Sequence, residues 1–523
     1  MLETAFARRY VLPVAAALVP IALLVMVAYL VRPDVRVAGV TDGGAIQPAA
    51  LGQVEITTNG DADRIQVLLD GAPVPTRWEG ERIHLDVPEP AEGEHTLEVR
   101  SPNTASVLPG RTTELTFTVD GTPPALAAPP VPATELDTAA TVHGTVHEES
   151  SVLAQGEPVE VADDGSFSVP VPAGTPMVTL EARDEAGNVT TEDVSIPVRH
   201  PGMRAVHMTA HAWASKALRE PIMEMAREGR IDTVQLDIKD ESGQIGYLSE
   251  VPLANEIGAA KDYYDVRAAL DELHAAGLRV AGRIVVFRDP VLGEAAWSSG
   301  NTDWLVQNTN GNPWTGGYGE YAFTNFANPD VRAYNLDIAR EAAALGFDEI
   351  LYDYIRRPDG HIEQMQFPGL TTTPEESIAS FLAESRPLVR EHGALLGVSV
   401  FGIAATRPTQ IAQDIPAMSK YVDYVSPMTY PSHWGSGEYG VANPEAQPYD
   451  ITARSLADFV TLAEESSTTV IPWLQDFSLR IPYGPEEVRA QIEAAEANGI
   501  DSFILWNAGC RYHAEALDPV PRE

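Results

Sequence analysis

The sequence predicts a multidomain chain with an N-terminal transmembrane helix, two β-sandwich modules and a C-terminal (β/α)8 barrel. Three observations predict this order. An uncharged run covers residues 11–31, short alternating strands with frequent turn residues cover about 34–198, and repeated strand–helix units follow from Met203. The length of 523 residues is sufficient for roughly two to four domains.

The charge balance excludes some classes of partner. The chain has 35 basic and 75 acidic residues, a net charge of −40. Nucleic acid requires clusters of Lys and Arg, so we expect no nucleic-acid partner. With a single cysteine, Cys510, the chain cannot form an internal disulfide. No CxxC motif or histidine-rich cluster indicates zinc, and we expect neither a metal nor a cofactor.

Residues 1–33 are predicted to be a cytoplasmic stub and a membrane anchor. The run 11–31 contains no charged residue, and roughly 20 apolar residues span a bilayer. Arg8 and Arg9 precede it and favour an inside N-terminus. We therefore expect a single-pass protein of the cell membrane whose later domains are extracytoplasmic. Pro13 and Pro20 weaken the helix, and a cleaved signal peptide is the alternative.

Residues 34–121 and 135–199 are predicted to be two β modules, separated by a Pro- and Ala-rich linker at 122–134. Short strands with turn signals every 8–12 residues are typical of sandwiches. The ending LEARDEAGNVTTEDVSIPV, residues 180–198, resembles the closing hairpin of bacterial Ig-like modules. The modules are interpreted as spacers, with a carbohydrate-binding role as the alternative.

Residues 200–523 are predicted to form the barrel. Eight strands are expected, with amphipathic helices between them, at 205–211, 233–238, 279–287, 349–355, 396–401, 424–430, 470–477 and 502–506. Repeated strand–helix units imply parallel strands with right-handed crossovers. No Gly-rich phosphate loop follows the first strand, which argues against an open dinucleotide-binding sheet.

The C-terminal strand ends of such a barrel build its site, and they are polar here. Asp237, Asp353 and Asp476 end predicted strands two, four and seven. Paired carboxylates can cleave a glycosidic bond, and nearby aromatic rings can stack on sugars. The predicted substrate-binding residues are Arg288, Tyr430, Trp434, Trp473, Gln475, Trp506 and Asn507.

Each candidate carboxylate also has a structural interpretation. Asp353 could pair with Arg356 or Arg357, since a buried carboxylate needs a partner. Asp237 could pair with Lys239 or Arg283, and Asp476 could cap the following loop. The loop at about 290–328 is long for a structureless connection and is interpreted as a functional lid.

The motifs at these strand ends resemble a known family. They are LDIKDESGQIGY, RIVVFRDP, DEILYDYIRRPDG, VSPMTYPSHW and PWLQDF, in that order. Together they resemble the glycoside hydrolase family DUF4015, a distant relative of α-amylase-type barrels. The resemblance implies that Asp353 is the nucleophile and that Asp476 stabilises the transition state.

Predicted strand five departs from the amylase pattern. It reads LGVSVFG and offers Ser399 where amylase-like barrels carry the acid glutamate. We assign the acid to Asp237, with Asp240 and Glu241 as substitutes. The predicted function is hydrolysis of a cell-wall or extracellular polysaccharide. One alternative is a catalytically idle barrel that binds polysaccharide, and another is a metal-dependent hydrolase, against which the lack of paired histidines argues.

Overall fold

The computed structural model describes residues 34–520, apart from 59–63, 80–81, 88–89, 103–109, 148 and 467. The predicted membrane anchor at 11–31 lies outside the described residues. Within the part of the chain that is described, no helix is long and apolar enough to cross a membrane. The chain divides into two compact units, and their boundary passes through the second β module.

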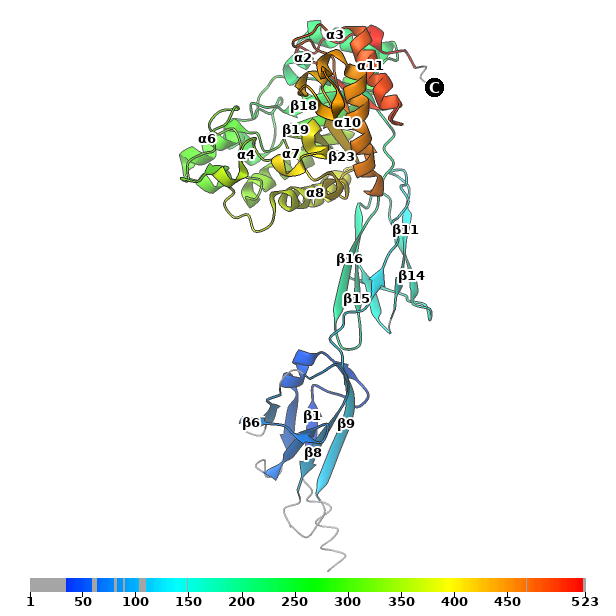
Figure 1. The fold of residues 1–523 in the computed structure, drawn as a ribbon, viewed down its shortest axis with the longest axis vertical. Coiled ribbons are helices and arrows are strands. Elements are labelled where there is room, and N and C mark those ends of the chain that lie inside the picture. The colour runs from blue at the N-terminus through cyan, green and yellow to red at the C-terminus, as the bar shows by residue number, and fades with distance from the viewer. Residues whose placement is uncertain are drawn as a thin grey trace, which may run out of the picture. The chain divides into compact units, whose positions relative to one another are not determined.

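The first β module is a sandwich of two sheets (Figure 1). One sheet has the order β1 (Val35–Ala38), β3 (Glu55–Thr58), β7 (Arg82–Leu85) and β6 (Thr76–Glu79). The other has the order β2 (Ala45–Ile46), β9 (Arg111–Val119), β8 (Gly93–Ser101), β4 (Gln66–Leu69) and β5 (Ala72–Pro73). Alternate side chains of both sheets meet in one buried cluster that includes Ile56, Ile83, Leu97 and Phe117. The predicted β-sandwich is therefore present.

The second β module also has two sheets. One contains β10 (Leu126–Ala127), β11 (Ala140–Val146) and β14 (Ser166–Val171), and the other β13 (Glu157–Val159), β12 (Ser151–Ala154), β15 (Met177–Arg183) and β16 (Val189–Ser195). The closing hairpin expected from the segment 180–198 is present, because residues 184–188, DEAGN, form the turn that joins β15 to β16. The predicted linker at 122–134 contains β10, because Leu126 and Ala127 pair with β11. Proline is tolerated beside such a short edge strand.

The third part is a closed ring of parallel strands, as predicted. Its order is β17 (Arg204–Met208), β18 (Thr233–Lys239), β19 (Arg279–Val285), β21 (Glu349–Asp353), β23 (Leu395–Phe401), β24 (Tyr424–Met428), β26 (Trp473–Gln475) and β27 (Phe503–Trp506), and β27 pairs with β17. Pro472 divides the predicted seventh strand into β25 (Thr469–Val470) and β26, since proline cannot donate a ladder hydrogen bond.

Helices surround the ring (Figure 1). Those between successive barrel strands are α2 (Ala210–Ala214), α3 (Lys216–Arg227), α4 (Pro252–Glu256), α5 (Val266–Ala275), α6 (Pro290–Ser299), α7 (Pro329–Leu345), α8 (Pro374–Arg390), α9 (Ile415–Ser419), α10 (Pro448–Ala463) and α11 (Pro485–Glu496). The predicted lid at 290–328 is therefore partly helical. Asp289 caps α6 and Pro290 occupies its first turn.

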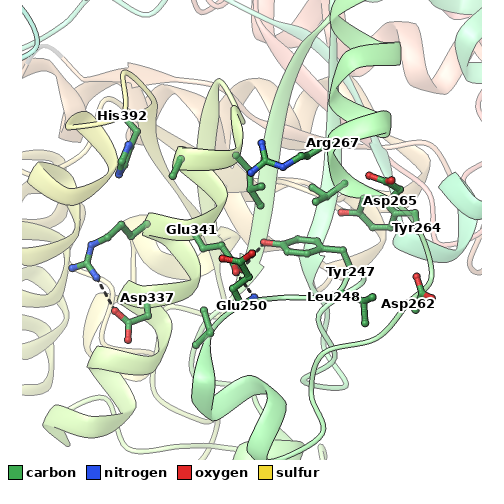
Figure 2. A pocket seen from close by; sticks show the side chains of 15 residues that line it. Tyr247, Leu248, Glu250, Asp262, Tyr264, Asp265, Arg267, Asp337, Glu341 and His392 are labelled. Atoms are coloured by element: carbon green, nitrogen blue, oxygen red, sulfur yellow. Dashed lines mark hydrogen bonds and ion pairs between the residues drawn. The ribbon is translucent and has the colours of Figure 1, made fainter.

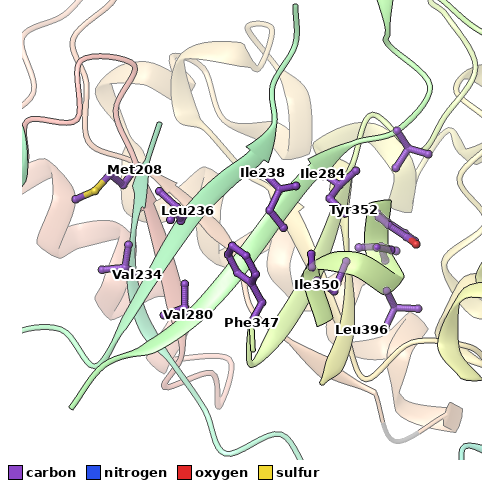
Figure 3. Packing of buried hydrophobic residues seen from close by; sticks show 14 of the residues in the cluster. Met208, Val234, Leu236, Ile238, Val280, Ile284, Phe347, Ile350, Tyr352 and Leu396 are labelled. Carbon is purple, nitrogen blue, oxygen red and sulfur yellow. The ribbon is translucent and has the colours of Figure 1, made fainter. Parts of the chain in front are cut away.

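The main core lies between the strands and the helices (Figure 3). Leu236, Ile238, Ile284 and Phe347 are almost fully buried there. Gly282 permits this close packing, because a Cβ at that position would lie 2.3 Å from Ile238 Cδ1. A second buried cluster, which includes Ala205, Leu351, Ile471 and Ile504, fills the interior of the ring. The interior of the ring is thereby filled, and a barrel of this fold carries its site at the strand ends.

Candidate active site

Asp353 is the last residue of β21, and its carboxylate is fixed on both oxygens. Arg283 of β19 donates to Asp353 Oδ2 from Nε at 2.9 Å and from Nη2 at 2.5 Å. Asp353 Oδ1 accepts the backbone N–H of Tyr354 at 2.7 Å. Only 3% of Asp353 is exposed. Tyr354 itself has a φ of +49°, a conformation that costs about 1–3 kcal/mol and is common at functional sites.

The Arg283 guanidinium binds two further carboxylates. Its Nη1 lies 3.0 Å from Asp237 Oδ1, and its Nη2 lies 2.5 Å from Glu241 Oε1. Burial acts to lower the pKa of Arg283, but the three carboxylates hold it well above its usual value. Burial acts to raise the pKa of Glu241, and the charge of Arg283 overcomes this and lowers it to about 2. The result is one buried cation shared by three acids.

A cavity of about 210 Å³ opens above this cluster. It lies at the carboxyl ends of the strands, where a barrel of this fold carries its site. Its wall combines the charged cluster with aromatic and polar side chains. The lining residues are Glu241, Arg283, Tyr318, Asp353, Tyr354, Arg356, Ser399, Phe401, Gln413, Met428, Tyr430, His433, Trp473 and Trp506.

Asp237 lies beneath the cavity and is not part of its wall. It is 1% exposed, and His207 Nε2 approaches its Oδ2 to 3.7 Å. Burial raises the pKa of Asp237, although the charges of His207 and Arg283 oppose this. Of the two partners considered from sequence, Arg283 is the observed one. Lys239 instead binds Asp289 and Asn335 on the helix side, at 2.8 and 2.7 Å.

Asp476 is also absent from the cavity wall. It is fully buried, and its Oδ1 lies 2.6 Å from His513 Nδ1. Its Oδ2 accepts the His513 backbone N–H at 2.9 Å. Burial raises the pKa of Asp476, while these bonds to His513 act to lower it. Asp476 therefore holds the chain that follows β27, and the structure does not bring it together with Asp353.

The predicted substrate-binding residues divide into two groups. Tyr430, Trp473 and Trp506 line the cavity, and Trp473 Nε1 donates to Ser399 Oγ at 3.0 Å.

The other predicted binding residues are not part of the cavity wall. Gln475 is buried and bonds to the backbone of Ser432 and Phe477. Trp434 packs against Val441 and Ile451. Asn507 donates to the backbone oxygen of Asp476, and Arg288 donates to Tyr354 Oη at 2.9 Å.

Sequence reasoning missed several cavity residues. Arg283 was considered only as a partner of Asp237, yet a charged residue inside the apolar run of β19 is the same signal that identified Asp353. Others come from loops and strand ends, where no hydrophobic periodicity tells which way a side chain points. They are Tyr354, Arg356, Phe401 and Gln413. In the described residues, no group of three His, Cys, Asp or Glu side chains could hold a metal ion.

A larger pocket of about 670 Å³ lies between α5, α7 and the segment after β18 (Figure 2). Glu341 lies in it and accepts bonds from Tyr247 Oη, Ser249 Oγ and the backbone N–H of Glu250. These three bonds give the Glu341 carboxylate a structural role, because it satisfies donors of the segment after β18. The pocket contains none of the strand-end residues that surround Asp353, so the smaller cavity is the candidate active site.

Two family models match parts of the chain. Residues 205–512 match the family DUF4015, described as "Putative glycosyl hydrolase domain", and residues 126–200 match "Glucodextranase, domain B". No curated protein matches the chain significantly.

Several solved structures are similar to the chain. A hypothetical protein from Ruminiclostridium thermocellum is 33% identical, covers 37% of this chain and 96% of its own, with a TM-score of 0.33. The PgaB (BpsB) glycoside hydrolase domain from Bordetella bronchiseptica is 16% identical, with coverages of 59% and 95% and a TM-score of 0.47. The α-galactosidase TtGalA from Thermus thermophilus is 15% identical, with coverages of 87% and 92% and a TM-score of 0.38.

Proposed function

Because the chain belongs to the glycosyl hydrolase family DUF4015, we propose that it hydrolyses a glycosidic bond in an extracellular or cell-wall polysaccharide, with Asp353 as the reacting carboxylate. One observation carries the proposal. Asp353 ends a buried strand, is oriented by Arg283, and lines a cavity that also holds Tyr430, Trp473 and Trp506. Glycoside cleavage requires such a fixed carboxylate at the sugar.

The spacing of two carboxylates supports a retaining mechanism. Asp353 Oδ2 and Glu241 Oε1 each lie 2.5 Å from Arg283 Nη2, so they are at most twice that distance, 5.0 Å, apart. Retaining glycosidases separate their carboxyl groups by about 5–5.5 Å, and inverting ones by about 6.5–9.5 Å. Asp353 would attack the sugar and form a covalent glycosyl ester, which water then hydrolyses.

The acid must reach the leaving oxygen, and this favours Glu241 over the predicted Asp237. Glu241 lines the cavity, and its side chain is 37% exposed, whereas Asp237 is buried behind Arg283. The low pKa of Glu241 depends on Arg283. A sugar that separates Glu241 from Arg283 would leave burial unopposed and raise that pKa, which is the requirement for an acid.

The remaining predicted residues have supporting roles in this proposal. Asp237 holds Arg283 and thereby orients Asp353. Asp476 acts through His513 and Asn507, at the rim formed by the end of β27. Tyr430, Trp473 and Trp506 would stack on or enclose the sugar rings, as aromatic side chains do in concave sites.

The test compares three variants on two kinds of substrate. Asp353→Asn should reduce hydrolysis by at least about a thousandfold on polysaccharides and on dinitrophenyl glycosides, because the nucleophile is lost. Glu241→Gln should stop polysaccharide cleavage and spare only the first step with dinitrophenyl glycosides, whose leaving groups need no proton. A burst of dinitrophenolate should therefore precede slow hydrolysis of the glycosyl ester, because the acid also serves as the base of the second step.

A third variant, Asp237→Asn, tests which carboxylate is the acid. If Asp237→Asn gives the pattern expected of Glu241→Gln, the acid assignment is wrong. Asp271→Asn, an exposed position on α5, is the control and should retain full activity. Reducing-end release from a glycan panel and the anomer formed are the readouts. Full activity of Asp353→Asn on any cleaved substrate would contradict the proposal.

A second function is favoured by the end of strand five. The residue there is Ser399, which is 1% exposed and bonded to Trp473 Nε1. The acid glutamate of amylase-type barrels is therefore missing from strand five. A barrel that binds polysaccharide without cleaving it would not need this acid. Binding of a polysaccharide by the unmodified chain, without release of reducing ends or of dinitrophenol, would support this alternative.

We also propose that residues 11–31 anchor the chain in the cell membrane, with the barrel outside. The supporting observation is the uncharged run after Arg8 and Arg9. Protease treatment of intact cells should digest the barrel. N-terminal sequencing of the membrane fraction should give the unprocessed start, and an N-terminus beyond residue 31 would show a cleaved signal peptide instead.

A further inference from the structure

Two arginines lie beside the aromatic part of the cavity wall. Arg356 lines the cavity and is 5% exposed, and Arg288 is partly buried next to it. Arg288 Nη1 donates to Tyr354 Oη at 2.9 Å, and Arg356 Nη2 donates to Tyr318 Oη at 3.2 Å. The two cations thus share one pair of tyrosines.

The rings hold both guanidinium groups by their faces. Arg288 lies 4.7 Å from the Tyr318 centroid and 4.9 Å from the Tyr354 centroid. Arg356 lies 5.7 and 5.2 Å from the same two rings and 5.5 Å from Phe401. Such stacking fixes a guanidinium in place. Arg356 Nη1 also donates to the backbone oxygen of Arg357 at 2.9 Å, whereas among the described residues the only hydrogen bond of the Arg288 guanidinium is the one to Tyr354, so Arg288 has the freer N–H edge for a planar anion.

The charges at this place do not balance. Arg356 has an ion pair with Asp359 at 3.3 Å, and the Asp359 side chain is 51% exposed. Arg288 has no ion pair with any described residue and bonds instead to the neutral phenol of Tyr354. Partly buried arginines are normally paired with a carboxylate, and this chain has many carboxylates, with a net charge of −40. The unpaired charge of Arg288 is therefore unusual and could be neutralised by an anionic ligand.

We propose that the substrate is an acidic polysaccharide, and that Arg288 and Arg356 bind the carboxylate of a uronic acid unit. The inference rests on the proposed function and adds its substrate class. Tyr354 follows Asp353 directly, so the carboxylate belongs to a sugar bound beside the reacting carboxylate. Arginine suits this role, since its planar fork matches a carboxylate with two parallel N–H bonds.

Binding is measured in the Asp353→Asn chain, so that cleavage does not consume the ligand. The probes are polygalacturonate, alginate and hyaluronan, the same three polymers after chemical reduction of their carboxyl groups, and neutral dextran and amylose. Dextran sulfate tests whether any polyanion suffices. At least one carboxylated polymer should bind, and its reduced form should bind about tenfold or more weakly, as expected for loss of a charged hydrogen bond.

Arg288→Met, in the same background, should weaken binding of the carboxylated polymer by a similar factor and leave the reduced form unchanged. Arg227→Met removes an exposed arginine of α3 and should change neither. For the cleaving enzyme, the loss in Arg288→Met should appear mainly in KM.

The inference would be overturned if none of the carboxylated polymers bound, or if their reduced forms bound equally well. It would also be overturned if the Arg288→Met variant bound like the parent. Stronger binding of dextran sulfate, in competition for the same site, would be the fourth contrary result. Failure of the proposed function is a separate outcome, since binding of uronic acid polymers without cleavage by the unmodified chain would refute hydrolysis and keep this inference.

Discussion

Replacing Arg283 by methionine should test how far one side chain organises the barrel. The guanidinium donates to Asp353, Asp237 and Glu241, and only 3% of Arg283 is exposed. Methionine fills a similar volume but leaves three carboxylates without their cation. Removing one partner of a buried ion pair costs about 3–5 kcal/mol, a large share of a typical folding free energy of about 5–15 kcal/mol.

The loss should also depend on pH. In the unmodified chain the pKa of Glu241 is lowered to about 2, so its pairing contributes stability above the unfolded pKa of about 4.3, and this contribution is lost as the pH falls toward 2. Without Arg283, burial raises that pKa, and the folded variant binds a proton more readily than the unfolded chain. The stability difference between the two proteins should therefore be largest near pH 7 and shrink toward pH 4.

Urea unfolding followed by tryptophan fluorescence measures this difference. Trp78 is the only one of the eight tryptophans outside the barrel region, so the signal reports mainly on the barrel. Arg227→Met, which removes an exposed arginine, is the control and should change the free energy of unfolding by less than about 1 kcal/mol. An Arg283→Met variant as stable as the control at pH 7, or a difference that grows on acidification, would refute the reasoning.

Three further predictions concern other parts of the chain. Burial acts to lower the pKa of His95, but its bonds to Ala91 and Asp70 raise it. NMR titration should therefore give a value above 6.5 that falls in Asp70→Asn, and the stability from this pair should be lost as the pH rises through the folded pKa of His95. Gly397→Ala places a Cβ 2.1 Å from a tyrosine ring and should cost about 1–3 kcal/mol by overpacking, whereas Gly317→Ala, with open space around it, should be near neutral in thermal unfolding. Burial raises the pKa of the Cys510 thiol, so it should react with a thiol reagent only after urea unfolding; rapid reaction of the native chain would contradict this.

The barrel could be predicted because its strands are apolar runs between amphipathic helices. The predicted ranges 233–238 and 349–355 differ from β18 and β21 by only one or two residues at an end. The first predicted strand, 205–211, was too long, because the Thr209 side chain accepts the N–H of Ala212 and starts α2. The residue pair Asp289–Pro290 is a helix-start signal that went unused, so α6 was interpreted as part of a lid.

The site was less predictable because strand position does not fix side-chain partners. The structural alternative for Asp353 was a pairing with Arg356 or Arg357, three or four residues away, but its partner Arg283 lies on the neighbouring strand. The register of β18 against β19 shifts between Asp237 and Lys239, and such a bulge changes the face on which the next side chain lies. Asp476 meets His513 across 37 residues of sequence, a distance over which one sequence gives no pairing information.

The hydrogen bond between Trp473 and Ser399 has a consequence for enzyme engineering. An obvious design would convert Ser399 to glutamate and so install the acid that amylase-like barrels carry on strand five. Ser399 is almost fully buried, and the Trp473 indole lies over it at hydrogen-bonding distance. A longer, charged side chain there would have to displace the indole or remain buried without water. The graft would therefore need a smaller residue at position 473 as well, which would remove one of the aromatic walls of the cavity.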